Sequence, residues 1–181
     1  LANEPILAMQ YSITEGYPPL RNALKDDMAS KKCFNAEIDD LIITSGAQQA
    51  NELATKVLCN EKDKLVCESP SFIGSLNSFR SYNVDLIGVP LENDGMNMEI
   101  LEEELKKGGV KLIYVIPNFQ NPTGLTMSLE KRKVLYELAC KYNTMILEDN
   151  PYGDIRFAGK DIVSIKSMDT EGRVIYSGTF S

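Results

Sequence analysis

The sequence predicts an α/β fold with three layers, in which helices cover both faces of a mostly parallel sheet. Short apolar runs alternate with segments whose apolar residues recur at helical spacing, as expected when strands are joined by crossover helices. The chain has 181 residues, of which 43% are apolar, so it can bury a substantial core. It contains no internal repeat and no low-complexity linker, which favours one domain or one large part of a domain.

The N-terminal half contains five predicted elements. PPLRNALKDDMASKK (18–32) is predicted as a helix opened by proline, which suits a first turn because no N–H partner is needed there. LIITS (41–45) and KLVCE (64–68) are predicted strands. AQQANELATKVL (47–58) and SFIGSLNSFRSYN (71–83) are predicted helices.

The C-terminal half continues the alternation. A helix is predicted over 98–108, where glycines follow its end, and another over 129–143, with Ser128 as its N-cap. Strands are predicted at 84–91, 111–116, 144–148 and 173–178.

Composition excludes several classes of function. The net charge is −7, without a basic run, which argues against nucleic acid as the main partner. No apolar stretch approaches the ~20 residues that span a bilayer, and the N-terminus lacks the pattern of a signal peptide. We therefore expect a cytoplasmic protein with reduced cysteines and no membrane segment.

The chain has four cysteines and no histidine. No cysteine pair has the spacing of a zinc site, and histidine-based metal sites and catalytic triads are excluded within this chain. We expect no metal. Acid–base chemistry must use other side chains or a cofactor.

Ligands of such sheets bind beyond the carboxyl ends of the strands, so the residues that follow each strand are the candidates. Gly46, Ala47 and Gln48 open a helix after 41–45, either as an anion site for a phosphate or as an ordinary strand–helix turn. Phe72 follows 64–68 and is either a core residue or a stacking partner for a flat ligand.

The later strand ends carry polar groups. PNFQNPTG (117–124) holds Asn118, Gln120 and Asn121, which form a turn or hold a ligand. Asp149 and Tyr152 follow 144–148, as a cap and turn or as a carboxylate and phenol aimed at a ligand. Small hydroxyl residues follow the last strand, in the stretch YSGTFS (176–181).

Taken together as ligand contacts, these strand ends would bind an anion, stack an aromatic ring and present an amide, a carboxylate, a phenol and hydroxyls. A flat, phosphorylated heteroaromatic molecule with a ring nitrogen fits this set, and pyridoxal phosphate is such a molecule.

The chain resembles the fold-type-I, pyridoxal-phosphate-dependent aminotransferases of class I and II. It looks closest to the branch of 2-aminoadipate and kynurenine aminotransferases, which includes aminotransferase-like domains of bacterial transcription regulators. QNPTG (120–124) and EDNPYGDIRF (148–157) are specific motifs of the resemblance, and TSGAQQA (44–50) supports it. YSGTFS (176–181) matches the stretch that precedes the lysine carrying the cofactor.

The resemblance implies roles for the residues around the cofactor ring. Asp149 would pair with the pyridine nitrogen, while Asn121 and Tyr152 would bond the phenolic oxygen. Asn121 would also help to hold the substrate carboxylate. Phe72 stands where the family has a stacking tyrosine, so a hydrogen-bonding role there is in doubt. Asn118 and Gln120 would support the turn around Asn121.

The resemblance also implies phosphate contacts and a dimer. Gly46, Ala47, Gln48 and Thr179 would bind the phosphate, with Ser177 and Ser181 as further candidates. Tyr11 resembles the tyrosine that reaches the phosphate of the neighbouring subunit, which implies a homodimer. The substrates would be an amino acid and a 2-oxo acid.

The sequence departs from the family pattern at its C-terminus. The cofactor lysine is expected just after Ser181, so the chain as given is expected not to transaminate. Lys160 and Lys166 are expected to be solvated charges in polar loops rather than substitutes. Residues 1–17 would lead into the large domain, and residues 18–181 would form most of it. A lyase of the same fold and the ligand-sensing domain of a regulator stay open as alternatives.

Overall fold

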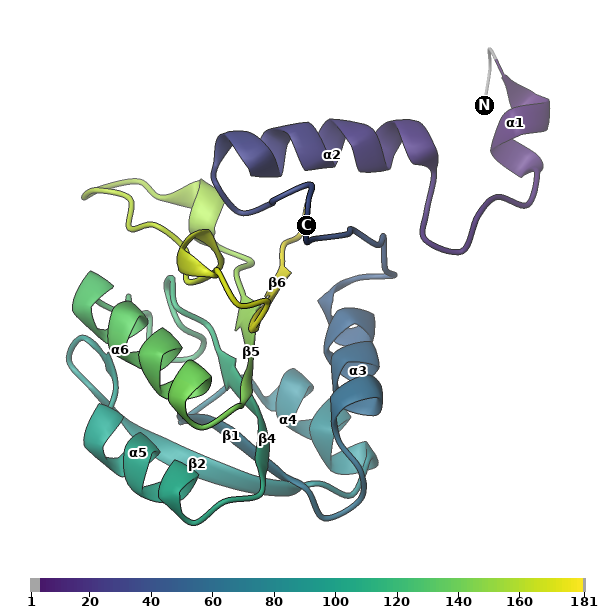
Figure 1. Ribbon diagram of the computed structural model, residues 1–181. Coiled ribbons are helices and arrows are strands. Elements are labelled where there is room, and N and C mark those ends of the chain that lie inside the picture. The colour runs from purple at the N-terminus through teal and green to yellow at the C-terminus, as the bar shows by residue number, and fades with distance from the viewer. Residues whose placement is uncertain (1–3, 181) are drawn as a thin grey trace. The chain divides into compact units, whose positions relative to one another are not determined.

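The computed structural model describes residues 4–180, which divide into two compact units after Thr44. The first unit contains α1 (Pro5–Met9) and α2 (Pro18–Ser30), drawn in purple and dark blue in Figure 1. α2 begins at Pro18 as predicted. Within this unit, Asp40 pairs with both Arg21 and Lys25, at 2.8 and 2.7 Å, and so joins the loop after α2 back to the helix.

The strand predicted at 41–45 is wrong. This segment is not among the strands of the described sheet. Its polar backbone groups bond elsewhere: the Ile43 N–H donates to the Glu15 carbonyl at 2.9 Å, and the Leu41 carbonyl accepts from Arg21 Nε at 2.8 Å. An apolar run becomes a strand only where a neighbouring strand completes its hydrogen bonds.

The second unit is built on a six-stranded sheet in the order β3-β2-β1-β4-β5-β6. β1, β2, β4, β5 and β6 run parallel, and β3 pairs antiparallel with β2. The predicted mostly parallel sheet is confirmed. The strands are β1 (Lys64–Ser69), β2 (Asp85–Glu92), β3 (Gly95–Met96), β4 (Val110–Val115), β5 (Met145–Asp149) and β6 (Val174–Ser177).

Helices cover both faces of this sheet, so the predicted three layers are confirmed. α3 and α4 lie on one side of it and α5 and α6 on the other (Figure 1). Their bounds are α3 (Ala47–Leu58), α4 (Ile73–Ser81), α5 (Met98–Lys106) and α6 (Leu129–Lys141).

The core has two halves because successive strand residues point to opposite faces. On β1, Leu65 and Cys67 pack in the cluster beneath α3 and α4, together with Phe79. Val66, between them, packs in the cluster beneath α5 and α6, together with Leu135. Burial on both faces explains why these strands are apolar runs rather than alternating patterns.

The helix ends follow the predicted signals. The Ser128 side chain accepts from the Lys131 N–H at 3.3 Å, which confirms the predicted N-cap of α6. Gly108 and Gly109 follow α5 with φ of 73° and 83°, values that glycine adopts without strain. The predicted helices agree with the structure within two residues at each end. The short elements α1, β3, η1 (Gly153–Ile155) and η2 (Lys166–Met168) were not predicted.

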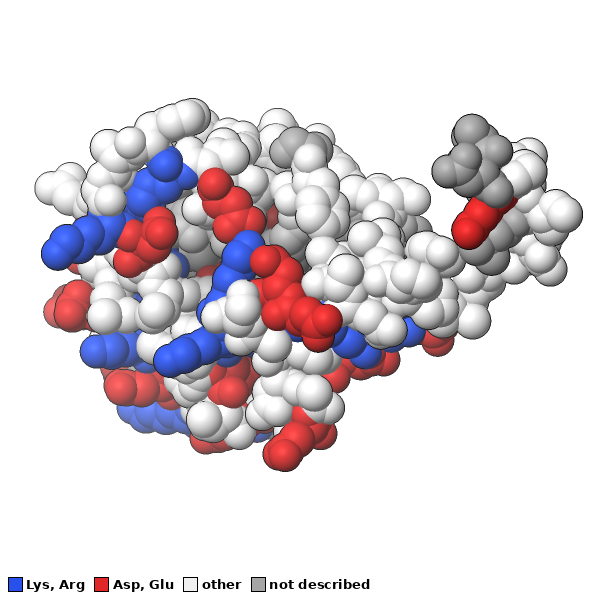
Figure 2. Space-filling view, turned by 90° about the horizontal axis from the view of Figure 1, so that it is seen from above, with Lys and Arg blue, Asp and Glu red and all other residues white. Residues whose placement is uncertain are grey.

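On the face in Figure 2, lysine and arginine side chains lie interspersed with aspartate and glutamate. Among the helices of residues 4–180, none combines the length and the apolar character that crossing a membrane requires.

Candidate functional site

Asp149 ends β5 at the carboxyl edge of the parallel sheet, and only 4% of it is exposed. Tyr114, on the adjacent strand β4, donates its hydroxyl to Asp149 Oδ2 at 2.8 Å. Burial raises the pKa of Asp149, and hydrogen bonds from Tyr114 and Asn51 lower it. None of these described groups carries a positive charge. A cationic donor on a bound molecule would therefore meet a strong acceptor here.

Asn121 and Tyr152 come together from different strand ends. Asn121 lies in the turn after β4, and its Nδ2 donates to the Tyr152 hydroxyl oxygen at 3.3 Å. Tyr152 follows Asp149 by three residues, and both members of the pair are half-buried. The amide and the phenol are therefore close enough to act on one polar atom of a ligand.

The rest of the turn at 117–124 is held by its own side chains. Gln120 Nε2 donates to the Pro70 carbonyl at 2.9 Å, and its Oε1 accepts from the Thr123 N–H at 3.0 Å. Asn118 Nδ2 donates to Asn150 Oδ1 at 2.8 Å. Asn118 and Gln120 thus support the turn by anchoring it to neighbouring segments, as expected, whereas the Asn121 side chain contacts Tyr152.

The start of α3 is open at Gly46. This glycine has a φ of 80°, and a Cβ built on it would meet nothing within 4 Å. The helix begins at Ala47, so its first N–H groups carry the partial positive charge that attracts anions. A Cβ on Gly74 would lie 2.6 Å from both Gln48 Nε2 and the Phe72 ring, so these two side chains converge on Gly74. The predicted anion and stacking residues are therefore neighbours.

The remaining predicted residues differ in how the structure places them. Thr179 is half-buried two residues after β6. Ser177 is buried, and its carbonyl accepts from the Asn150 N–H at 2.9 Å. Tyr11 is fully exposed and belongs to the first unit. Ser181 lies outside the described residues.

An apolar hollow of about 230 Å³ adjoins Tyr152, and Phe119, Ile155 and Phe157 line it as well. Arg156 covers another part of Phe119, with its guanidinium 4.6 Å from the ring centre. Tyr152 therefore lines this hollow, and its hydroxyl is within reach of Asn121.

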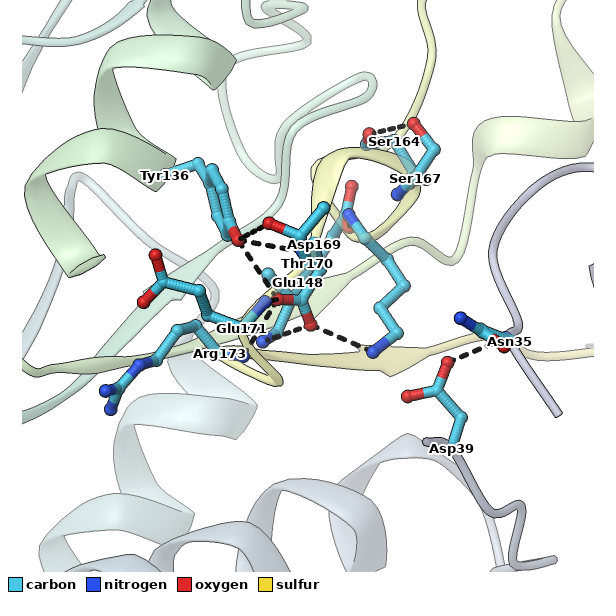
Figure 3. Close-up of polar contacts among 12 residues, drawn as sticks. Asn35, Asp39, Tyr136, Glu148, Ser164, Ser167, Asp169, Thr170, Glu171 and Arg173 are labelled. Atoms are coloured by element: carbon cyan, nitrogen blue, oxygen red, sulfur yellow. Dashed lines mark hydrogen bonds and ion pairs between the residues drawn. The ribbon is translucent and has the colours of Figure 1, made fainter. Parts of the chain in front are cut away.

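Lys166 is not a solvated charge, contrary to expectation. Its side chain is 9% exposed, and its Nζ lies 3.0 Å from Asp169 Oδ2. Asp169 also accepts from the backbone of Arg173 at 2.9 Å and from the Tyr136 hydroxyl at 3.4 Å (Figure 3). Asp169 thus accepts hydrogen bonds from three segments of the chain. Lys166 is one of the donors. Lys160 is exposed, as expected.

Several buried polar residues around the site were not singled out from the sequence. Their side chains point into the core, which short sequence motifs do not reveal. Their positions on the apolar stripe of a helix or in a buried strand could have indicated this burial. They are Asn51, Glu68, Ser75, Tyr114, Arg132 and, as a buried acceptor, Glu148.

Glu68 is another buried acid at this edge of the sheet. It lies near the end of β1, is 2% exposed, and its Oε2 accepts from the Ile116 N–H at 3.1 Å. Burial raises the pKa of Glu68 to about 8, although hydrogen bonds from Ile116 and Gln120 oppose the shift. The folded protein therefore keeps this proton at neutral pH, where an unfolded chain would release it.

Glu68→Gln should flatten the pH dependence of stability. From about pH 5 to about pH 8 the folded state alone holds the Glu68 proton, so the free energy of unfolding falls as pH rises, by at most ~1.4 kcal/mol per pH unit. Urea unfolding of wild type and variant across this range measures the difference. Glu61→Gln, at an exposed acid, is the control and should keep the wild-type slope. An unchanged slope in Glu68→Gln would show that Glu68 is ionised in the folded state.

Comparisons with known proteins identify the family of the chain. A sequence model of the family described as Aminotransferase class I and II matches residues 7–181. The chain belongs to the class I and II aminotransferases. The fold and the predicted resemblance are thereby confirmed.

Individual relatives within the class I and II aminotransferases are similar over nearly the whole chain. "Aromatic-amino-acid aminotransferase 1" of Thermococcus litoralis is 45% identical over 179 residues, which are 96% of this chain and 43% of that protein. The crystal structure of a kynurenine aminotransferase from Pyrococcus horikoshii, in complex with PMP, has a TM-score of 0.93 at 42% identity. The match covers 98% of this chain and 46% of the other.

A regulator is also similar. An uncharacterised HTH-type transcriptional regulator of Bacillus subtilis is 35% identical over 179 residues, which are 99% of this chain and 37% of the regulator. The chain therefore spans less than half the length of the relatives that it matches.

Proposed function

We propose that this chain is the greater part of the cofactor-binding domain of a pyridoxal-phosphate-dependent aminotransferase, which moves an amino group between an amino acid and a 2-oxo acid. The observation that carries the proposal is Asp149, a carboxylate that ends a parallel strand, is buried, and accepts a hydrogen bond from the neutral Tyr114 hydroxyl. In this proposal, residues 1–17 lead into the large domain and residues 18–181 form most of it.

The side chains fit the cofactor at each of its ends. Asp149 would accept from the protonated ring nitrogen, which supplies the positive charge that the described groups around it lack. Asn121 and Tyr152, joined at 3.3 Å, would donate to the phenolic oxygen. Phe72 would cover one face of the ring. Pyridoxal phosphate, when bound, withdraws electrons from the α-carbon of the amino acid substrate.

The phosphate would lie at the open start of α3. Gly46 leaves space there, and the N–H groups of Ala47 and Gln48 belong to the first turn of the helix. Thr179 would bind the phosphate from the segment after β6, and Ser177 and Ser181 are further candidates. The cofactor lysine would follow Ser181. Asp149 would keep the ring nitrogen protonated, and Asn121 would orient the substrate carboxylate.

We also propose a cytoplasmic homodimer, in which Tyr11 of one subunit reaches the phosphate in its partner. The exposure of Tyr11, a large aromatic side chain, in the first unit supports such a contact. The names of the relatives suggest aromatic amino acids and kynurenine as the first amino donors to test, and the resemblance adds 2-aminoadipate.

The test is an assay of the complete protein, purified with pyridoxal phosphate and supplied with these amino acids and 2-oxoglutarate. We expect a new amino acid to form in proportion to the 2-oxo acid consumed. Turnover that needs no 2-oxo acid and releases ammonia would indicate a lyase instead. The 35% identity with a regulator favours one further candidate, a ligand-sensing domain, which would bind the cofactor and an amino acid without turnover.

A further inference from the structure

Asp149 and three buried side chains behind it form a continuous row of hydrogen bonds across α3, α4, β4 and β5. Asn51 Nδ2 donates to Ser75 Oγ at 2.9 Å, Ser75 Oγ lies 2.8 Å from the Tyr114 hydroxyl, and that hydroxyl donates to Asp149 Oδ2 at 2.8 Å. We propose that Tyr114 is a positioning residue that, with Ser75 and Asn51 behind it, holds Asp149 as an ionised acceptor for the ring nitrogen of the cofactor. This inference rests on the proposed function.

The direction of the row follows from counting hydrogens. An ionised carboxylate only accepts, so the single hydrogen of the Tyr114 hydroxyl goes to Asp149. Tyr114 then has only its lone pairs to offer, so Ser75 must donate its hydrogen to Tyr114. Ser75 in turn accepts from the amide of Asn51. Every bond therefore points toward the carboxylate, and donors in series strengthen one another.

The row is closed off from water. Asn51 and Ser75 are each 1% exposed and Tyr114 is 0% exposed, so none can exchange its partner for solvent. The Phe79 ring packs edge-on against Tyr114, with centroids 5.1 Å apart, and so limits movement of the phenol. A donor fixed in this way costs no reorganisation when charge is present on Asp149.

The row also leaves room for the ligand. Tyr114 and Asn51 each supply a hydrogen bond to Asp149, whereas a carboxylate offers about four acceptor positions. Asn51 Oδ1, which would repel the carboxylate, is buried without a hydrogen-bond partner among the described residues. The amide nitrogen thus donates to Ser75 and to Asp149, while the amide oxygen has no partner among the described residues. A purely structural asparagine would be expected to satisfy both ends.

The experiment is Tyr114→Phe in the complete protein, loaded with pyridoxal phosphate labelled with ¹⁵N in the ring. Phenylalanine keeps the ring packing against Phe79 and removes only the hydroxyl. We expect the ¹⁵N resonance to move toward that of the unprotonated ring, and the dissociation constant of the cofactor to rise about tenfold, the effect of one lost bond to a charged group. The ¹⁵N resonance and the dissociation constant are both measured at one pH. At a single pH, a change in the charge of Glu68, the other carboxyl that acts on Tyr114, does not contribute to the difference.

Tyr136→Phe is the matched control. It also removes a tyrosine hydroxyl that bonds an aspartate, Asp169, but outside this row. It should leave the ¹⁵N resonance and the cofactor affinity as in the wild type. Ser75→Ala removes the donor behind Tyr114 and should move both readouts in the same direction as Tyr114→Phe, by a smaller amount.

The outcomes separate this inference from the proposed function. A protonated ring in the wild type that stays protonated, and equally tightly bound, in Tyr114→Phe and Ser75→Ala would refute the role of the row alone. A wild-type protein that binds no pyridoxal phosphate, or binds it with an unprotonated ring, would overturn both. If Tyr136→Phe had an equal effect, the row would only contribute to general stability, and its proposed role in positioning Asp149 would be refuted.

Discussion

Asp149→Asn in the complete protein should lower the rate of transamination by roughly 10²- to 10³-fold, the usual effect of removing one preorganised electrostatic group from a catalytic site. Asparagine has the same shape and still accepts from the Tyr114 hydroxyl, but it carries no charge to keep the ring nitrogen protonated. The measurement is kcat/KM for transamination with a saturating 2-oxo acid.

Folding and activity should respond to this change in opposite directions. Burial raises the pKa of Asp149, so the carboxylate is held in its charged form at a cost to stability. A neutral side chain removes that cost, and thermal unfolding of the cofactor-free variant should occur at the same temperature or a higher one. Loss of activity together with loss of stability would instead indicate a general defect.

Asp85→Asn is the matched control for Asp149→Asn. Asp85 also belongs to a parallel strand, but it begins β2 at the opposite, amino edge of the sheet, and its side chain is 56% exposed. Its substitution should leave kcat/KM unchanged. Wild-type kcat/KM in Asp149→Asn would remove Asp149 from the proposed role.

The general architecture could be predicted because strands buried on both faces and amphipathic helices leave clear patterns in a sequence. The rule that parallel strands end at one edge also placed Asp149 and the 117–124 turn on the same side of the sheet. The contact between Asn121 and Tyr152 follows from that topology, since β4 and β5 are neighbours.

Which segments pair as strands could not be predicted in the same way. LIITS (41–45) has the composition of a strand, but a strand also needs a partner, and the described sheet does not include this segment. The backbone groups of Leu41 and Ile43 bond to α2 and to the loop before it instead. Local pattern therefore sets what a segment is able to form, and its neighbours decide whether it forms.

The supporting polar residues escaped prediction for another reason. Tyr114 stands inside KLIYVI, where an aromatic residue is expected as core, and Ser75 and Asn51 are ordinary residues of predicted helices. Their function depends on direction, since all three point into one buried row. Small polar residues on the core-facing side of α3 and α4 were the available signal.

Arg132 supports the turn that contains Asn121. It does so from the side of the sheet that α5 and α6 cover. It is fully buried on α6, on the same stripe as Leu135. Its guanidinium donates to five oxygens: those of Met127 at 3.1 Å, Ile162 at 3.3 Å, Val163 at 2.9 Å and Pro117 at 2.9 Å, and Asn118 Oδ1 at 2.7 Å. Glu148, nearby, offsets part of the cost of burying the charge. One side chain thus ties the 117–127 loop and the 162–163 segment to a helix.

Arg132→Met should therefore destabilise the complete protein by roughly 3–5 kcal/mol, because it removes five hydrogen bonds, three of them buried, while nearly preserving volume. Urea unfolding of the cofactor-free protein measures this loss. Arg132→Lys should recover part of it, since lysine keeps the charge and three donors but not the planar fork. Arg80→Met, which removes an exposed arginine from α4, is the control and should change stability by no more than ~0.5 kcal/mol. If Arg132→Met were as stable as Arg80→Met, the five bonds would contribute nothing net to holding these loops, and the position of Asn121 would have to depend on the contacts of Gln120 and Asn118 alone.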